Sequence, residues 1–290
     1  MSPTRPWTRR RWDRRLARTG GGAGVLIAQL TDLHLRPRGL AANRVVETNM
    51  LAARALQAAA AHRPDVLLLT GDLADRGEPG AYRLLARMLG EQSGLPPVFA
   101  IPGNHDDRAA LAAALPGVAR LTDGFLQFVE EAFPVRLVLL DTLVPGASHG
   151  ELCADRLAWL DRTLSAAPDR PSLVALHHPP FATGIDHMDR IALRDPAGFA
   201  AVLARHPQVR LVVCGHVHRP IVTRIAEAVV CIAPSVAHQV ALDLRADAPS
   251  AFVLEPAAFL LHQWDAAAGF VTHTALVEAF PGPFPFLAAD

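Results

Sequence analysis

The amino-acid sequence predicts an α/β protein with a largely parallel β-sheet flanked by helices. From Val25 onwards, runs of about five to seven residues rich in Val, Leu and Ile alternate with helix-length segments. Parallel strands need a crossover between them, usually a helix, so this alternation favours a parallel sheet. We find no internal repeat and no linker that separates two cores, and one large domain with embellishments can fill the 290 residues.

The elements follow one another in a regular order. The predicted strands are VLIAQLT (25–31), VLLLT (66–70), VFAIP (98–102), RLVLLD (136–141), SLVALH (172–177) and LVVCG (211–215). The predicted helices cover 43–62, 80–89, 154–167 and 196–205. The sequence PIVTRIAEAVVCIAPS, residues 220–235, predicts a hairpin beside the sheet. The segment from Glu255 onwards is rich in proline and aromatic residues and predicts no element.

Composition restricts the class of protein. Hydrophobic residues make up 51% and charged residues 19%, which is ample for a core, and the formal net charge is zero. A chain without net charge has no overall electrostatic attraction for nucleic acid or an anionic membrane, so the charge does not point to such a partner. Three unevenly spaced cysteines do not form a disulfide framework, so a cytoplasmic location is the simpler inference. We also find no run of about 18–20 apolar residues that could span a membrane.

The arginine-rich start of the chain stands apart from this pattern. Residues 1–22 hold seven arginines and end in a glycine run, where a signal peptide would have an apolar stretch. We expect this segment to be a disordered arm, with binding of an acidic partner as the alternative.

Polar side chains follow five of the predicted strands. The residues at these strand ends are Asp32 and His34, Asp72, Asn104 and His105, His177 and His178, and His216 and His218. The carboxyl end of an α/β sheet is where ligands bind, so we expect the groups at one edge of one sheet. For IPGNHDD, residues 101–107, the alternative is a turn in which Asn104 or Asp106 caps a helix starting near Arg108.

These residue types together suit a metal site. Burying so many polar groups without compensation costs on the order of a few kcal/mol each, and coordination is a natural compensation. Oxygen and nitrogen ligands without cysteine suit Mn, Fe, Zn, Co or Mg. Residues two apart in a strand share a side, so Asp32 with His34, and His216 with His218, could each face one site. The carboxylate of Asp72 could bridge two ions about 3.5–4 Å apart.

The ordered set of motifs D-x-H, GD, GNHD, HH and GHxH resembles the signature of the calcineurin-like metallophosphoesterases. Within that superfamily the chain is similar to the class III cyclic-nucleotide phosphodiesterases, and especially to bacterial glycerophosphodiesterases. The further likeness lies in TGDLADRGEPGAYR, HHPPFATGIDHMDRIAL and APSVAHQV, and it weakens after Leu244. The resemblance implies a four-layer α/β/β/α sandwich with a small C-terminal β extension.

The resemblance also implies roles for individual residues. Two divalent metal ions of the Fe, Mn, Zn or Co type are expected, one held by Asp32, His34, Asp72 and His218. The second is expected to be held by Asp72, Asn104, His177 and His216. His105 would contact the phosphate and could protonate the leaving alkoxide, and His238 matches a substrate-contacting histidine. His178 is expected either to contact the substrate or to support a metal-ligating residue without binding an ion itself.

The expected activity is hydrolysis of a small phosphodiester, a 3′,5′-cyclic nucleotide or a glycerophosphodiester, by attack of a metal-bound hydroxide. The alternatives are a phosphomonoesterase and a non-catalytic binding scaffold on the same fold. The expected domain is 23–245, with 246–290 as an extension that packs on it or forms an oligomer contact. We expect a small-molecule substrate, no nucleic acid or membrane partner, and a homo-oligomer.

Overall fold

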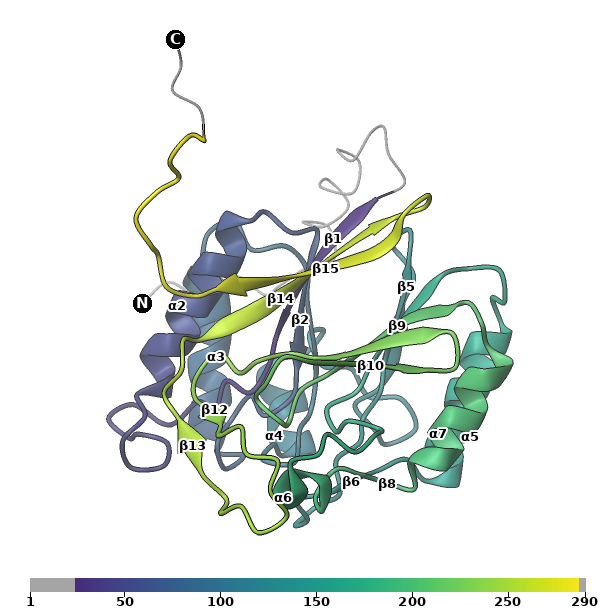
Figure 1. The fold of residues 1–290 in the computed structure, drawn as a ribbon, viewed down its shortest axis with the longest axis horizontal. Coiled ribbons are helices and arrows are strands. Elements are labelled where there is room, and N and C mark those ends of the chain that lie inside the picture. Colours follow the sequence, from purple (N-terminus) through teal and green to yellow (C-terminus); the bar gives the residue numbers. More distant parts are fainter. Residues whose placement is uncertain (1–23, 287–290) are drawn as a thin grey trace.

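Residues 24–286 are described by a computed structural model of the chain, in which two β-sheets pack face to face (Figure 1). The first sheet has the strand order β15-β14-β1-β2-β3 and the second β10-β11-β9-β7-β5-β4. The first sheet comprises β1 (Val25–Leu30), β2 (Val66–Thr70), β3 (Val98–Ile101), β14 (Ala258–Asp265) and β15 (Gly269–Leu276). The second comprises β4 (Phe128–Glu130), β5 (Arg136–Leu139), β7 (Ser172–Ala175), β9 (Val209–Cys214), β10 (Ile221–Ile225) and β11 (Ala228–Ile232).

Helices cover the outer face of each sheet. The helices are α2 (Thr48–Ala61), α3 (Pro79–Glu91), α4 (Arg108–Ala114), α5 (Ala154–Ser165), α6 (Asp186–Asp189) and α7 (Pro196–Arg205). Figure 1 shows α2 and α3 on the side of the first sheet and α5 and α7 on the side of the second. Two short strand pairs complete the chain, β6 (Gly150–Glu151) with β8 (Leu193–Arg194) and β12 (Gln239–Val240) with β13 (Phe252–Val253).

Alternation along the strands creates three apolar layers. Leu67 and Leu69 of β2 face the cluster shared with α2 and α3, whereas Leu68 faces the cluster between the sheets. Val138 of β5 and Val212 of β9 face α5 and α7. Because successive side chains of a strand point to opposite faces, each sheet has two buried faces. The fold is therefore the expected four-layer sandwich.

The structure corrects the expectation of a single sheet. The strands β1, β2 and β3 pair in parallel in the first sheet, and β5, β7, β9 and β11 pair in parallel in the second. The predicted hairpin is present as β10 and β11, which pair antiparallel. The segment after Glu255, which predicted no element, forms β14 and β15, and β14 pairs antiparallel with β1.

The helix predicted over 43–62 begins later than expected. Residues 42–46 form a tight turn, so α2 starts at Thr48, whose hydroxyl donates to the carbonyl of His34 at 2.7 Å. The predicted arm, residues 1–22, lies outside the described residues. Within the described part of the chain, no helix has the length and apolar character needed to cross a membrane.

Candidate metal centre

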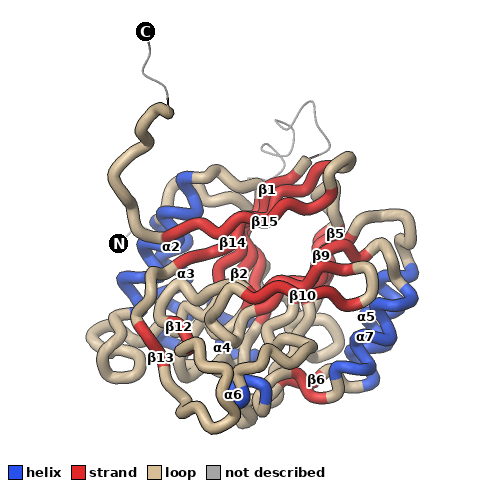
Figure 2. The backbone as a smooth tube through the Cα atoms, viewed as in Figure 1, coloured by secondary structure: helices blue, strands red, loops and turns tan. Residues whose placement is uncertain are grey.

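The strand-end residues of both sheets meet in one place. Asp32, His34, Asp72, Asn104 and His105 follow strands of the first sheet, and the four histidines His177, His178, His216 and His218 follow strands of the second. In Figure 2 loops gather below the two sheets, around α4, α6, β12 and β13. Four overlapping groups of three side chains have potential ligand atoms within 4.8 Å of one another: His34, His218 and His238; His177, His178 and His216; His34, Asp72 and His105; Asp32, Asp72 and His177.

The backbone at these positions is not that of a strand. Asp32, His34, Asp72, His216 and His218 have positive φ values of 54°, 45°, 49°, 72° and 55°. The alternation argument for Asp32 with His34 and His216 with His218 is therefore wrong, because each pair lies beyond its strand. Left-handed residues other than glycine cost on the order of 1–3 kcal/mol each and cluster at functional sites.

Glycines let the loops approach one another. A Cβ atom on Gly103 would lie 2.1 Å from Oδ1 of Asp72, and one on Gly71 would lie 2.3 Å from Nδ1 of His177. A Cβ on Gly215 would lie 2.1 Å from the hydroxyl oxygen of Thr31. The absence of a side chain at Gly103 thus permits close contact with Asp72.

The imidazole rings are held through their Nδ1 atoms. Nδ1 of His177 lies 2.9 Å from the carbonyl oxygen of Thr70, and Nδ1 of His218 lies 2.8 Å from that of His238. Nδ1 of His34 lies 3.2 Å from the Asp75 carboxylate. In the neutral form of each ring these acceptors place the proton on Nδ1, which leaves a lone pair on Nε2. The Nε2 atoms of His177 and His216 are buried and have no hydrogen-bond partner among the described residues.

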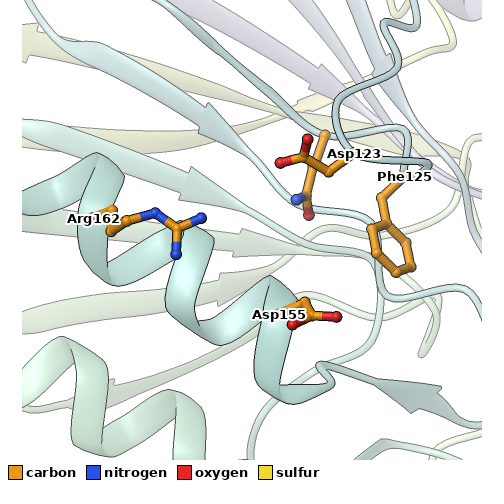
Figure 3. A pocket seen from close by; sticks show the side chains of 5 residues that line it. Asp123, Phe125, Asp155 and Arg162 are labelled. Carbon is orange, nitrogen blue, oxygen red and sulfur yellow. The ribbon is translucent and has the colours of Figure 1, made fainter.

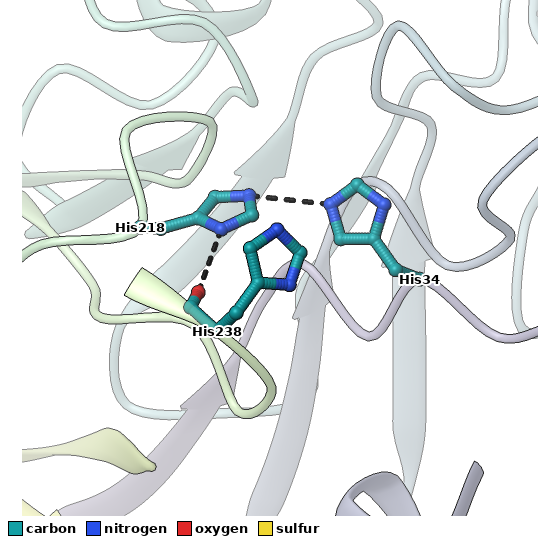
Figure 4. Close-up of side chains that lie close together, drawn as sticks. All are labelled: His34, His218 and His238. Carbon is teal, nitrogen blue, oxygen red and sulfur yellow. Dashed lines mark hydrogen bonds between the residues drawn. The ribbon is translucent and has the colours of Figure 1, made fainter. Parts of the chain in front are cut away.

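The rings of His34 and His218 face each other through their Nε2 atoms (Figure 4). Their Nε2 atoms are 3.2 Å apart, and Nε2 of His218 is also 3.2 Å from Oδ1 of Asp32. With both ring protons on Nδ1, two lone pairs face each other beside a carboxylate, which is unfavourable without a cation. The unpartnered nitrogens and this contact both fit divalent metal ions.

Charge is strongly coupled across the site. Burial opposes ionisation of Asp32, but the neighbouring His218 outweighs it and lowers the pKa of Asp32 to about 2. Burial similarly opposes ionisation of Asp72, yet His177 and His105 lower its pKa well below the usual value. Burial and the neighbouring His177 lower the pKa of His216 to about 3. Burial opposes protonation of His177 and His218, but the neighbouring carboxylates outweigh it: Asp72 raises the pKa of His177 to about 9, and Asp32 raises the pKa of His218. The site therefore combines two ionised carboxylates with imidazole rings that these carboxylates favour in the cationic form when no metal ion is bound.

His105, His178 and His238 surround this cluster. The side chain of His105 is 41% exposed, and its Nε2 lies 3.9 Å from Oδ2 of Asp72. His238 packs with ring centroids 4.8 Å from His218 and 5.3 Å from His34. His178 is fully buried, and its Nδ1 lies 2.8 Å from the hydroxyl oxygen of Thr142, with Nε2 unpartnered.

The two aspartates after His105 have different functions. Asp107 is the N-cap of α4, and its side chain accepts a hydrogen bond from the amide of Ala110 at 2.8 Å. Asp106 does not cap the helix. It accepts from the amides of Leu73, Ala74 and Gly103 and from the hydroxyl of Tyr82. Asp106 thereby joins the loops that carry Asp72 and Asn104.

Sequence reasoning missed the residues that support the rings. Asp75 contacts Nδ1 of His34 and accepts from Arg36 at 3.1 Å. Its only signal is its place three residues after Asp72 in TGDLAD. Leu33, between Asp32 and His34, is buried in the core cluster beneath α2 and α3.

A separate pocket of about 250 Å³ lies beside α5 (Figure 3). Asp123, Phe125, Gln127, Asp155 and Arg162 line it. It includes none of the predicted ligand residues, so it is distinct from the metal centre.

Comparison with known proteins identifies similar sequences. Residues 25–220 match the family model described as calcineurin-like phosphoesterase. The chain is 36% identical over 270 residues to a probable glycerophosphodiester phosphodiesterase, GpdQ, of Arcobacter nitrofigilis, covering 90% of this chain and 97% of that protein. It is 36% identical over 201 residues to the 3′,5′-cyclic adenosine monophosphate phosphodiesterase CpdA of Escherichia coli, covering 69% of this chain and 71% of that protein.

A solved structure shows the same fold at low sequence identity. A dimetal phosphatase from Danio rerio superposes with a TM-score of 0.61 at 15% identity, covering 89% of this chain and all of that chain.

Proposed function

The chain belongs to the calcineurin-like phosphoesterase family, and on that basis we propose that it hydrolyses small phosphodiesters at the metal centre described above. The observation that carries the proposal is the set of buried, unpartnered imidazole nitrogens beside two ionised carboxylates. Such a set is costly in a protein unless it binds cations.

Each of the two proposed ligand sets contains residues from both sheets. Asp32, His34, Asp72 and His218 would hold one divalent ion, and Asp72, Asn104, His177 and His216 would hold the other. Bound there, two such ions would activate water and neutralise charge on the phosphate oxygens. The surrounding protein groups orient the ligands, because Thr70, Asp75 and the carbonyl of His238 fix the ring tautomers.

Three further histidines are proposed to contact the substrate. His105 is the candidate for proton donation to the leaving alkoxide, since its Nδ1 is bound to the carbonyl of Asp75 at 2.7 Å and its Nε2 stays available. His238 lies beside His34 and His218, where it could hold the phosphodiester. Thr142 holds His178 against His216, with ring centroids 4.6 Å apart, which supports a role close to the phosphate.

The substrate is proposed to be a 3′,5′-cyclic nucleotide or a glycerophosphodiester. Both reactions share one reacting centre, and the relatives bear both names. Rates on cyclic AMP, glycerophosphoethanolamine and p-nitrophenyl phosphate, measured side by side, decide between them. A preference for p-nitrophenyl phosphate would instead favour the phosphomonoesterase alternative.

The proposal is tested by the variant Asp72→Asn. Loss of the bridging charge is expected to abolish hydrolysis of bis(p-nitrophenyl) phosphate and to lower the metal content, with the fold retained in circular dichroism. Asp155→Asn, in the separate pocket, is the matched control and should retain both properties. A wild-type protein that binds less than one ion per chain under metal-replete conditions would favour the scaffold alternative.

A cytoplasmic homo-oligomer is also proposed. All three cysteines are free, which suits a reducing compartment. The edge strand β15 carries no charged residue, and Val271 and Leu276 on it are 44% and 46% exposed. Such an edge is a template for pairing with a second copy. Native mass spectrometry at micromolar concentration should show an oligomer that Val271→Lys weakens, and a wild-type monomer would refute it.

A further inference from the structure

A strained turn lies between the first two predicted ligands and α2. The amide of Val45 donates to the carbonyl of Ala42 at 3.1 Å, and Ala42 and Val46 exchange two hydrogen bonds of 2.9 Å. The two central residues, Asn43 and Arg44, have φ values of 48° and 68°. Turns with two successive left-handed residues favour glycine, asparagine or aspartate at these positions, and arginine is unfavourable there. A strained turn that persists is a reason to look for a function.

The turn presents Asn43 to His238. Nδ2 of Asn43 lies 3.3 Å from Nε2 of His238, although the two residues are 195 positions apart in the sequence. The ring of Phe252 also contacts His238 edge to face, with centroids 5.2 Å apart. Phe252 is held by its pairing with Val240 between β12 and β13. The His238 ring is thus held by Asn43 on one loop and by Phe252 on another, and neither of these two residues is a proposed metal ligand.

The contact with Asn43 defines the tautomer of His238. An amide nitrogen can only donate, so Nε2 of His238 accepts, and the ring proton lies on Nδ1. Nδ1 is buried and has no partner among the described residues. A buried donor without an acceptor costs about 1–3 kcal/mol. Because the ring packs against His34 and His218, this donor lies beside the metal centre (Figure 4).

We propose that Asn43 is a positioning residue that fixes His238 in the Nδ1-protonated tautomer, so that Nδ1–H donates to an oxygen of the bound phosphodiester. The inference rests on the proposed function, since it assigns the acceptor to the substrate. The strained turn serves to hold the amide against the ring. Asn43 would then act on substrate binding through His238, without touching the metal ions.

The first test is the tautomer itself, read by NMR on protein with ¹⁵N-labelled histidine and loaded with zinc, which is diamagnetic. The chain has 13 histidines, and the His238 signals are identified by their loss in His238→Ala. The wild type should show protonation at Nδ1 only. Asn43→Gly keeps a residue suited to positive φ but removes the amide, so the single tautomer should be lost. Arg44→Gly relaxes the same turn and should leave the tautomer unchanged.

The second test is kinetic. Asn43→Gly should raise KM for the phosphodiester by roughly 10- to 100-fold, the usual effect of removing a supporting partner, with kcat less affected. In the His238→Ala background the same change should have no further effect, because the two residues act as one unit. A His238 ring protonated at Nε2 in the wild type would overturn the inference. So would an Asn43→Gly variant with wild-type tautomer and KM.

These outcomes are separable from the proposed function. If the zinc-loaded wild type hydrolyses no phosphodiester, the proposed function fails, and the assignment of the acceptor fails with it. If it is active and Asn43→Gly matches it in tautomer and KM, only the role of Asn43 fails.

Discussion

At Gly103 the loop after β3 meets the loop after β2 at a distance that no larger residue permits. The added methyl group in Gly103→Ala would lie 2.1 Å from Oδ1 of Asp72 and 2.4 Å from its amide nitrogen. Because the second contact is with backbone, Asp72 must move. We expect metal affinity to fall by roughly 10- to 100-fold, as when a ligand loses its support. The measurement is titration of the metal-free protein with zinc or manganese.

The matched control is Gly90→Ala in α3. A Cβ atom on Gly90 meets nothing within 4 Å. That change should leave metal affinity alone and stabilise the helix by roughly 0.5–1 kcal/mol. Equal metal affinity in Gly103→Ala and the wild type would show that the loops tolerate the added atom.

The variant His105→Ala tests whether this histidine protonates the leaving group. His105 is not needed to complete either proposed ligand set, so the variant should keep its metals. We expect kcat to fall by roughly 10² to 10⁴, the range for a general acid. The loss should shrink for a diester with a p-nitrophenolate leaving group, which needs little protonation. Loss of the metals, or an equal deficit on good and poor leaving groups, would assign His105 to another role.

Residue identities in the centre could be predicted from the sequence, whereas their supports could not. Asp32, His34, Asp72 and the histidine pairs stand directly after apolar runs, which is a local signal. Asn43 contacts His238 across 195 positions, and His34 contacts Asp75 across 41. No local pattern encodes these contacts. The sequence also does not predict the left-handed backbone at the proposed ligands, because aspartate and histidine are compatible with both strand and loop conformations.

At the scale of elements, apolar runs located most of the strands, and β14 and β15 were missed. The strand β14 reads AFLLHQWD, in which His262 and Gln263 interrupt the apolar run. In the structure His262 is completely buried, and its Nε2 lies 3.1 Å from Oε1 of Gln29 on β1. Gln29 in turn donates to the carbonyl of Cys214 on the second sheet. Because these polar residues interrupt its apolar run, the sequence pattern did not predict β14 as a strand.

This buried histidine predicts acid sensitivity. Burial lowers the pKa of His262 from 6.5 to about 3, so the unfolded chain binds the proton more readily than the folded protein. Its contribution to stability is fully present above pH 6.5 and is lost as the pH falls from 6.5 towards 3. Below pH 6.5 the loss approaches about 1.4 kcal/mol per pH unit.

The comparison is urea unfolding of the metal-free wild type and His262→Gln between pH 7 and about pH 4.5, a range chosen to bracket histidine titration. Glutamine does not titrate, so the variant should be less stable at neutral pH and lose less stability on acidification. Parallel pH profiles of the two proteins would exclude His262 as a source of the acid sensitivity.

For the whole molecule, the strand and helix pattern predicted a parallel architecture without its division into two sheets. A strand-helix-strand unit specifies that neighbours are parallel and leaves open which sheet receives the next strand. The division falls between β3 and β4, where the chain passes from one sheet to the other, and alternating residues such as Leu68 and Leu173 fill the space between the sheets. The four-layer arrangement was available only through the family resemblance.

The division has a consequence for stability, because each proposed ion takes ligands from both sheets. His218 of the second sheet joins Asp32 and His34 of the first, and His177 and His216 of the second join Asp72. Bound metal should therefore hold the sandwich together. A ligand at 100 times its Kd that binds only the folded state stabilises it by about 2.7 kcal/mol.

In thermal unfolding this corresponds to a rise in Tm of roughly 5–10 °C, scaled from about 2–4 °C per kcal/mol for large domains. Wild type stripped by a chelator and reloaded with zinc should show the rise, and Asp72→Asn at the same zinc concentration should not. Asp155→Asn should follow the wild type, because it lies outside the centre. Equal Tm values for loaded and stripped wild type would mean that the two sheets are held together by their apolar contact alone.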